Sequence, residues 1–221
     1  SDSPSDVGIE IIIETLMKVL RKINVPSLTY SGGIDSTVML ALMSRLGKVD
    51  TYTIAHTEDH PDIKYSRLGS KLFNSNHTEF IVEPNTKDTD KFDGDNCVRQ
   101  LFENVNQITP WIVCCDGIDE FMCGYHKHKD CSFETYYYFL SRLYPDHLIP
   151  LNINSGNTKV FLPYLDEEVI SILSNIPLSS KVDSENRKKI MWQIAKHLGV
   201  PKEFYDRHKY GFCDAFRIKN V

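Results

Sequence analysis

The sequence predicts an α/β fold in which helices wind around a parallel sheet and a mostly helical part follows. Two observations lead to this prediction. Short β-rich or apolar runs alternate with segments whose apolar residues recur at helical spacing, as in sheets built by right-handed crossovers. From Asp130 onwards the pattern becomes mostly helical. A chain of 221 residues suits one domain, and we expect an α/β part over 1–129 and a helical part over 130–221.

Each expected element rests on local pattern. Apolar residues three and four apart predict helices, β-branched and aromatic runs predict strands, and Pro61 favours the first position of a helix. The expected helices are 7–23, 37–46, 62–73, 98–105, 133–143, 166–174 and 184–198, and the expected strands are 28–31, 49–56, 78–82 and 111–115.

Composition excludes several classes of protein. The net charge is −5 and the isoelectric point is about 5.9, so the chain as a whole has no general attraction for nucleic acid, although its last 35 residues are basic. The six cysteines form no C-x-x-C pair, and no apolar run is long enough to span a membrane. We therefore expect a protein with reduced thiols, in the cytoplasm and without a membrane partner.

The most informative stretch is Tyr-Ser-Gly-Gly-Ile-Asp-Ser-Thr at residues 30–37. It follows a short apolar strand and opens a helix, and the start of a helix has unpaired N–H groups that attract anions. Gly32 and Gly33 let the backbone approach an anion and adopt positive φ, while Ser31 and Ser36 add hydroxyl donors. Asp35 beside phosphates makes sense if it holds a metal ion that bridges them. The alternative is an ordinary joint in which Asp35 or Ser36 caps the helix.

Two other predicted strand ends supply further candidates, because ligands of parallel sheets bind beyond the carboxyl ends of the strands. The backbone of Ile54, Ala55 and His56 could pair with an adenine edge. The segment 114–120 places three carboxylates within five residues around Gly117, an arrangement that is costly without a cation. The alternative there is a turn whose acidic residues cap the next helix.

The loop at 31–36 is neither the Walker phosphate loop nor the dinucleotide Gly-x-Gly-x-x-Gly. It resembles the pyrophosphate loop (PP-loop) of the N-type ATP pyrophosphatases, which cleave ATP between the α- and β-phosphates. Four further segments, in order, are similar to motifs of the asparagine synthetase family and extend the resemblance over residues 28 to 212. These segments are Pro61–Lys64, Asp116–Tyr125, Phe161–Asp166 and the pair Lys188–Met191 with Arg207–Phe212.

The resemblance implies roles for particular residues. Asp35 and Asp119 would hold a Mg²⁺ ion that bridges the phosphates of ATP. Lys188 and Lys209 would neutralise the β- and γ-phosphates as they leave as pyrophosphate. Asp116 would face the acyl-adenylate and the incoming amine. ATP itself would be bound by Ser31, Gly32, Gly33, Asp35, Ser36, Ile54, Ala55, His56 and Gly117.

The activity implied by the resemblance is an ATP-dependent ligase that adenylates a small carboxylate, releases pyrophosphate and transfers an amine. The departures from the family pattern fall on residues that the resemblance places on the substrate side of the pocket. Cys114-Cys115 replaces the usual Ser-Gly, Ile118 replaces a small residue, and Trp192 stands where the helix usually has Arg. The family's Glu-x-Arg is missing from 154–159. ATP chemistry is therefore better supported than aspartate as substrate.

The residues before Ser31 contain no glutaminase, so the expected amine donors are free ammonia, ammonia from a partner glutaminase subunit, or another amine. Two alternatives remain. One is a different PP-loop enzyme, such as a tRNA lysidine-type ligase, NAD synthetase or thiolation enzyme, although nucleic acid is disfavoured as a partner. The other is a non-catalytic module that binds adenine nucleotides. His126 and His128 are expected in a surface turn rather than at a zinc site.

Overall fold

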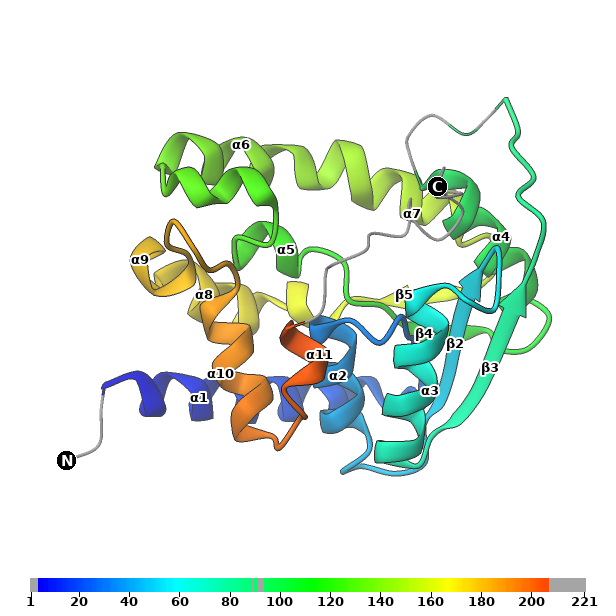
Figure 1. Ribbon diagram of the computed structural model, residues 1–221, viewed down its shortest axis with the longest axis horizontal. Coiled ribbons are helices and arrows are strands. Elements are labelled where there is room, and N and C mark those ends of the chain that lie inside the picture. Colours follow the sequence, from blue (N-terminus) through cyan, green and yellow to red (C-terminus); the bar gives the residue numbers. More distant parts are fainter. Residues whose placement is uncertain (1–3, 89, 91–93, 207–221) are drawn as a thin grey trace.

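A single parallel sheet organises the molecule. The computed structural model describes residues 4–88, 90 and 94–206, with side chains from residue 8 onwards. Five strands lie in the order β3-β2-β1-β4-β5, and every neighbouring pair is parallel (Figure 1). The predicted α/β class is confirmed. The strands are β1 (Ser27–Thr29), β2 (Asp50–Ala55), β3 (Asn76–Ile81), β4 (Trp111–Val113) and β5 (Lys159–Phe161).

The strand order reverses at β1, and in open parallel sheets the ligand crevice lies beyond the carboxyl ends of the strands at such a point. From β1 the chain moves outward through β2 and β3, and it then returns to place β4 on the other side of β1. Leu28 of β1 is in register with both Thr51 of β2 and Val113 of β4. The loops that leave β1 and β4 therefore begin next to each other, at the carboxyl ends of adjacent parallel strands. This is the position at which parallel sheets bind ligands.

Helices cover both faces of the sheet. They are α1 (Pro4–Ile23), α2 (Ile34–Met43), α3 (Pro61–Phe73), α4 (Asp95–Val105), α5 (Ile118–Phe121), α6 (Phe133–Leu143), α7 (Ile149–Asn154), α8 (Glu167–Asn175), α9 (Leu178–Lys181), α10 (Lys189–His197) and α11 (Glu203–Asp206). Short turns are the 3₁₀-helices η1 (His126–Asp130) and η3 (Pro163–Leu165) and the π-helical turn η2 (Tyr144–Leu148). In Figure 1, α6 and α7 run along the side opposite α1.

Adjacent residues of one strand show how the two faces are buried. Ile112 and Val113 of β4 point to opposite faces and belong to different hydrophobic clusters. The larger cluster joins α1, α2, α8 and α10 to the sheet, and the smaller one joins α4 and α7 to the other face. Helix α2 is buried from Ser36 to Met43 on all sides, which fixes the loop at its start.

Several elements differ from the sequence-based expectation, among them the helix near residue 184 and an edge strand. The helix expected from residue 184 begins only at Lys189. The reason is a local turn: the Asp183 carboxylate accepts hydrogen bonds from the backbone N–H groups of Glu185 at 2.9 Å and Asn186 at 2.7 Å, which competes with helix formation. The short edge strand β5 was not predicted, since its three residues carry no clear strand pattern.

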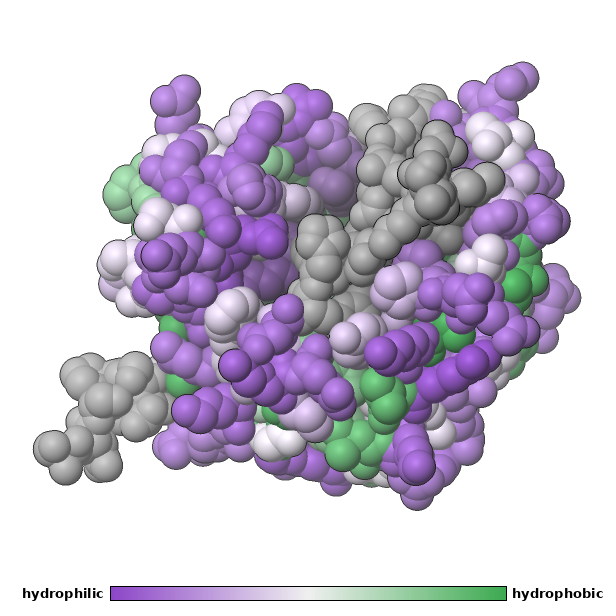
Figure 2. All heavy atoms as spheres, in the orientation of Figure 1, coloured by the Kyte–Doolittle hydropathy of each residue, from purple (hydrophilic) through white to green (hydrophobic). Residues whose placement is uncertain are grey.

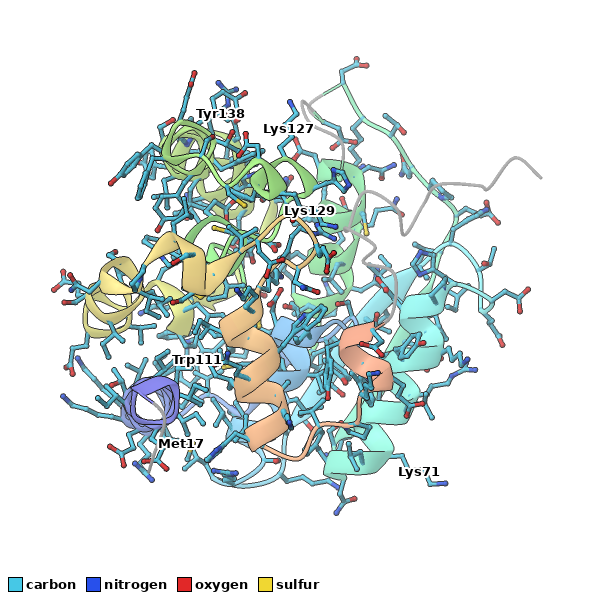
Figure 3. The ribbon with its side chains drawn as sticks, turned by 60° about the vertical axis from the view of Figure 1, so that its left-hand side comes forward. Met17, Lys71, Trp111, Lys127, Lys129 and Tyr138 are labelled. Atoms are coloured by element: carbon cyan, nitrogen blue, oxygen red, sulfur yellow. The ribbon has the colours of Figure 1, made fainter. Side chains whose placement is uncertain are left out.

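The surface is mainly polar. Figure 2 shows a largely hydrophilic face with a small hydrophobic area low in the view. In Figure 3, Lys127, Lys129 and Tyr138 lie together at the helical end of the molecule, far from Lys71 of α3. Within the part of the chain that the structure describes, no helix is both long enough and apolar enough to cross a membrane.

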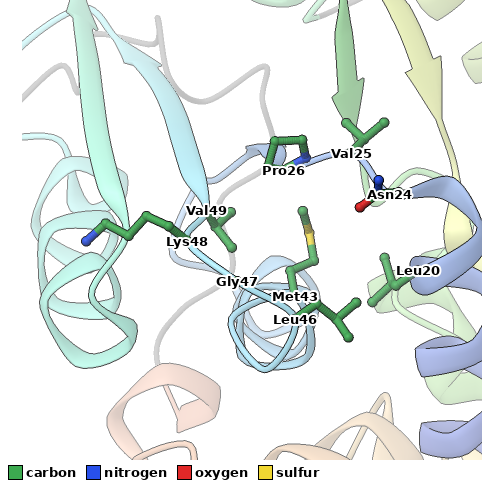
Figure 4. A pocket seen from close by; sticks show the side chains of 9 residues that line it. All are labelled: Leu20, Asn24, Val25, Pro26, Met43, Leu46, Gly47, Lys48 and Val49. Carbon is green, nitrogen blue, oxygen red and sulfur yellow. The ribbon is translucent and has the colours of Figure 1, made fainter.

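A small cavity of about 60 Å³ lies where β1 and β2 begin, next to the ends of α1 and α2 (Figure 4). Its walls are mostly aliphatic. Because it is at the amino ends of the strands, it lies away from the crevice at their carboxyl ends. The lining residues are Leu20, Asn24, Val25, Pro26, Met43, Leu46, Gly47, Lys48 and Val49.

Candidate active site

The loop after β1 presents the start of α2 to the crevice. Gly33 precedes the helix, and among the described residues no side chain caps it. The first backbone hydrogen bond of the helix runs from Thr37 N–H to the Gly33 carbonyl at 2.9 Å, so the N–H groups of 34–36 remain available to a ligand. The Ser31 hydroxyl accepts from Gly33 N–H at 3.3 Å and lies 3.5 Å from the Ser36 hydroxyl. The geometry suits an anion.

The two loop glycines have different roles. Gly32 has φ of +71°, and a Cβ atom on it would lie 2.5 Å from the Tyr65 Cβ atom of α3. Gly32 is therefore required both by its backbone conformation and by close packing. Gly33 is extended, with φ of −73°, so the expectation of positive φ at this residue was wrong. An added Cβ at Gly33 would meet only the Ser31 hydroxyl oxygen, at 3.3 Å.

Lys188 joins the loops that leave β1 and β4. Its ammonium group forms ion pairs with Asp35 Oδ2 and, at 2.6 Å, with Asp119 Oδ1. Only 4 % of Lys188 is exposed, and burial opposes its charge, but the two carboxylates outweigh burial and raise its pKa. Lys188 has φ of +53°, a conformation that costs energy for a non-glycine residue and is concentrated at functional sites. Three residues far apart in sequence thus converge.

Neighbouring groups hold this cluster in place. A Cβ atom on Gly124 would lie 1.7 Å from Asp119 Oδ1 and 2.5 Å from Lys188 Cε, so only glycine fits there. Arg187 donates to the Gly124 carbonyl at 2.7 Å. The buried Tyr164 hydroxyl donates to the Asp35 carbonyl at 2.8 Å and ties α2 to η3. The supporting roles of Gly124 and Tyr164 were not predicted, although the sequence showed Tyr where the family motif has Phe.

The cluster is chemically suited to Mg²⁺. Asp35 Oδ1 is buried and accepts no hydrogen bond from any described residue, which leaves one carboxylate oxygen for a further cation. Across the described residues, no three His, Cys, Asp or Glu side chains form a complete metal site. Mg²⁺ is typically held by one or two carboxylates together with substrate phosphates. Asp35 and Asp119 meet that description.

The three carboxylates after β4 do not act alike. Asp119 points to Lys188, whereas the buried Glu120 carboxylate accepts from the Tyr125 hydroxyl at 2.7 Å. Asp116 makes neither contact. Burial, opposed in part by His147 and reinforced by the neighbouring Glu120 carboxylate, raises the pKa of Asp116 to about 6. A carboxyl group with a pKa near neutrality can exchange protons with a reacting group.

The two cysteines before Asp116 pack in hydrophobic surroundings, Cys114 within the smaller cluster and Cys115 against the larger one. Burial raises the pKa values of the Cys114 and Cys115 thiols, so both stay uncharged and unreactive. Gly117 has φ of +92°, and a Cβ atom there would lie 2.3 Å from the Leu165 side chain. Gly117 therefore lets the loop after β4 pack against η3. This packing explains the glycine without any contact to ATP.

The end of β2 lies beside the loop after β1, with Ile54 and Ala55 buried. The Ala55 carbonyl accepts from Val82 N–H at 3.1 Å, so it is already used. Alternation along the strand directs the backbone groups of Ile54 towards β1, where an adenine edge could meet them. The His56 ring instead lies 3.4 Å from the Val82 carbonyl, towards β3 and away from the phosphate loop.

Two other expectations have clear outcomes. Lys209 lies outside the described residues. His126 is exposed as expected, but His128 is buried, with its ring stacked on Tyr125 at 5.7 Å between centroids. The expectation of a surface turn was therefore wrong for His128, because aromatic packing rather than solvent surrounds it.

Comparison with known proteins adds one finding. A family model described as asparagine synthase matches residues 24–88 and 154–220, more than half of the chain. The matched segments contain the loop at 31–36 and Lys188. They omit residues 89–153, and with them Asp116 and Asp119, which the fold brings to the same crevice. No curated protein matches the chain.

Proposed function

The chain belongs to the asparagine synthase family, which uses ATP for ligation, and we propose that it adenylates a small carboxylic acid and transfers an amine to the product. The observation that carries this proposal is the convergence of Asp35, Asp119 and Lys188 next to the uncapped start of α2. These groups occupy the place where the phosphates of ATP would bind.

Each group has a chemical task. The N–H groups of 34–36 and the hydroxyls of Ser31 and Ser36 bind phosphate oxygens. A carboxylate oxygen of the substrate attacks the α-phosphate, and the bond to the β-phosphate breaks with its electron pair retained by pyrophosphate. Lys188 exchanges its carboxylate partners for the leaving phosphates and stabilises the charge that develops on them. Mg²⁺, held by Asp35 and Asp119, would supply further neutralisation of phosphate charge.

The second step takes place near Asp116. An amine attacks the acyl carbon, the C–N bond forms, and the bond to AMP breaks with its electron pair on the phosphate oxygen. Asp116 takes the proton that the amine loses. Asp116 has acidic neighbours, which favour the binding of an amine beside it. The family's Glu-x-Arg segment is missing, so a second carboxylate on the acid substrate is less favoured there.

A module that only binds nucleotides is less well supported. Binding ATP does not require a buried lysine in a strained conformation between two carboxylates, because such a site costs stability. That cost is understandable if the lysine acts on a leaving group.

Product analysis tests the proposal. The protein is incubated with ATP, Mg²⁺ and a panel of carboxylic acids that includes the twenty standard amino acids, with and without ammonium. We expect AMP and pyrophosphate with at least one acid, and an amide when ammonium is present. Formation of ADP and phosphate would contradict the proposal, because it requires cleavage at a different phosphate.

A further inference from the structure

Exposed apolar side chains gather on the segment that α6, η2 and α7 form, residues 133–154, which runs along the side of the molecule opposite α1 (Figure 1). Of the thirteen exposed large hydrophobic side chains among the described residues, six lie on this segment. Such a concentration marks an interaction surface, which singly scattered residues do not. Five of the six form what we call the apolar stripe: Phe133, Tyr137, Tyr144, Ile149 and Ile153, each between 40 % and 68 % exposed.

The apolar stripe occupies one face of the segment. Phe133, Tyr137 and Tyr144 follow one another at intervals of four and seven residues, the spacing of a single helix face, and the rings of Phe133 and Tyr137 are stacked with centroids 6.3 Å apart. In an unbroken α-helix, Ile149 would point away from Tyr144. The π-helical turn η2 prevents this, because the Ile149 N–H donates to the Tyr144 carbonyl and so places Ile149 one full turn beyond Tyr144. Ile153 follows four residues later on the same face.

The apolar stripe is symmetric about residue 143. Phe133 and Ile153 lie ten residues to either side of it, Tyr137 and Ile149 lie six residues to either side, and Tyr144 lies next to the midpoint. Two copies of the segment that run antiparallel across a two-fold axis would therefore pair Phe133 with Ile153 and Tyr137 with Ile149, and both Tyr144 rings would lie near the axis. A two-fold interface requires this self-complementarity, because the same patch contributes from both subunits. A partner of another kind does not require it.

The exposed area is of the size that a stable dimer needs. An aromatic side chain offers about 150–250 Å², so the exposed parts of three aromatic and two isoleucine side chains amount to roughly 500 Å² on each copy. A standard interface covers about 800 Å² on each partner, of which somewhat more than half is apolar. The apolar stripe alone supplies that apolar share.

Charge favours a second copy over a nucleic acid. Residues 133–154 contain one Arg and no Lys, and Arg142 already pairs with Asp146, whereas a nucleic-acid surface needs clustered positive charge. Lys127 and Lys129 belong to η1 and lie near Tyr138, which is not part of the apolar stripe (Figure 3). The segment has only two acidic residues against its one Arg, so most of the net charge of −5 lies elsewhere and two copies can meet here with little repulsion.

We propose that the apolar stripe pairs with the apolar stripe of a second copy of this chain, antiparallel about a two-fold axis near residue 143. The contact has an aromatic and aliphatic centre and a polar rim, as stable interfaces do. The pairing is independent of the proposed ligase activity, so the failure of one has no bearing on the other.

The oligomeric state tests the proposal. The mass of the full chain, 25.4 kDa as a monomer, is measured by light scattering during size-exclusion chromatography and by sedimentation over a range of protein concentrations. We expect wild type to form a dimer of about twice that mass. Tyr144→Lys places two positive charges near the axis and should raise the dissociation constant of the dimer roughly 100-fold, since the change is present in both copies. Ile108→Lys, at an exposed residue outside the segment, is the matched control and should dimerise as wild type does.

A pair of opposite charges tests the antiparallel arrangement. Phe133→Glu and Ile153→Lys should each raise the dissociation constant roughly 10-fold or more, because each puts a charge into an apolar contact. The variant that combines them should recover most of this loss, since the new carboxylate and the new ammonium group would face each other across the interface. Both side chains are exposed in the single copy, so all variants should fold, which circular dichroism checks.

Three results would overturn the proposal. A wild type that stays monomeric at every concentration would exclude the second copy, and binding of single-stranded RNA that is lost in Tyr144→Ala would then assign the face to nucleic acid. A dimer that Tyr144→Lys and Ile108→Lys affect equally would place the interface elsewhere on the molecule. A combined variant that dimerises no more tightly than Phe133→Glu or Ile153→Lys alone would exclude the antiparallel pairing.

Discussion

On the proposed phosphate side of the crevice, two carboxylates share one buried ammonium group, whereas on the proposed acceptor side the buried Glu120 carboxylate lies against a phenol and a partly exposed imidazole, with Asp116 nearby. The first group, Asp35, Asp119 and Lys188, is held by direct ion pairs. The second, centred on Asp116 and Glu120, keeps an excess of negative charge. The first arrangement is ready to exchange partners with phosphates and a cation, and the second is ready to take up protons or a cationic amine.

Under the proposed function, the two groups assign the two steps of the reaction to different parts of one crevice. The segment 116–120 leaves β4 as a single short turn, yet Asp119 pairs with Lys188 while its neighbour Glu120 pairs with Tyr125. Substitutions on the two sides should therefore affect different steps.

The largest effect is expected for Asp35→Asn. Removing one charge from the carboxylate pair removes a proposed metal ligand and one partner of Lys188. We expect pyrophosphate release to fall on the order of 10²- to 10³-fold. The variant should still fold, which circular dichroism checks. The exposed Asp59→Asn is the control, and wild-type turnover in Asp35→Asn would show that Asp35 is not a metal ligand.

Lys188→Met should come next. Because a lysine on the leaving group matters more in the transition state than in the ground state, we expect kcat to fall roughly 10²-fold while the affinity for ATP changes little. Lys189→Met is the matched control, since Lys189 pairs with Asp183 and the Ser179 carbonyl outside the cluster. If both variants kept full turnover, the assignment of Lys188 would have to be abandoned.

Gly124→Ala tests the packing behind the phosphate side. The added methyl group would displace Asp119 and Lys188, and overpacking of this kind costs about 1–3 kcal/mol of unfolding free energy. Pyrophosphate release should fall as well. In Gly8→Ala, where a Cβ atom meets nothing within 4 Å, helix propensity should instead add about 0.5–1 kcal/mol. Urea unfolding measures the unfolding free energy of both variants. Equal values for Gly124→Ala and Gly8→Ala would contradict the close packing of Gly124 against Asp119 and Lys188.

The smallest effect concerns Asp116 and pH. Its pKa of about 6 in the folded protein exceeds the ordinary value of 3.8, so the folded state holds a proton that the unfolded state has lost between these values. The stability that this group contributes is therefore present below about pH 3.8 and is lost as pH rises through 6. Relative to Asp116→Asn, wild type should lose about 1–2 kcal/mol of unfolding free energy between pH 4 and pH 7, allowing for partial exposure. If the difference in unfolding free energy between wild type and Asp116→Asn did not vary with pH, the raised pKa of Asp116 would be contradicted.

The sequence predicted that Asp35 and Asp119 lie close together, because both follow strands and parallel strands bring their carboxyl ends together, whereas the place of Lys188 beside them followed only from the family resemblance. It did not reveal how those residues are supported. Gly124 is required because a Cβ atom there would collide with the Asp119 and Lys188 side chains. Tyr164 acts through a hydrogen bond from its hydroxyl to the Asp35 carbonyl, 129 residues earlier in the chain. His147, which lies 3.6 Å from Glu120, belongs to the π-helical turn η2, and no spacing pattern in the sequence indicates such a turn.

The central claim is that the carboxylate substrate attacks the α-phosphate of ATP, and an isotope experiment tests it most directly. The acid that gives the strongest pyrophosphate release is prepared with ¹⁸O in its carboxyl group and incubated with ATP, Mg²⁺ and ammonium. Mass spectrometry of the nucleotide product should show AMP that carries one ¹⁸O atom, because the acyl oxygen remains on the phosphate when the amine displaces it. AMP without ¹⁸O, formed alongside pyrophosphate, would mean that water attacks ATP and would contradict the account.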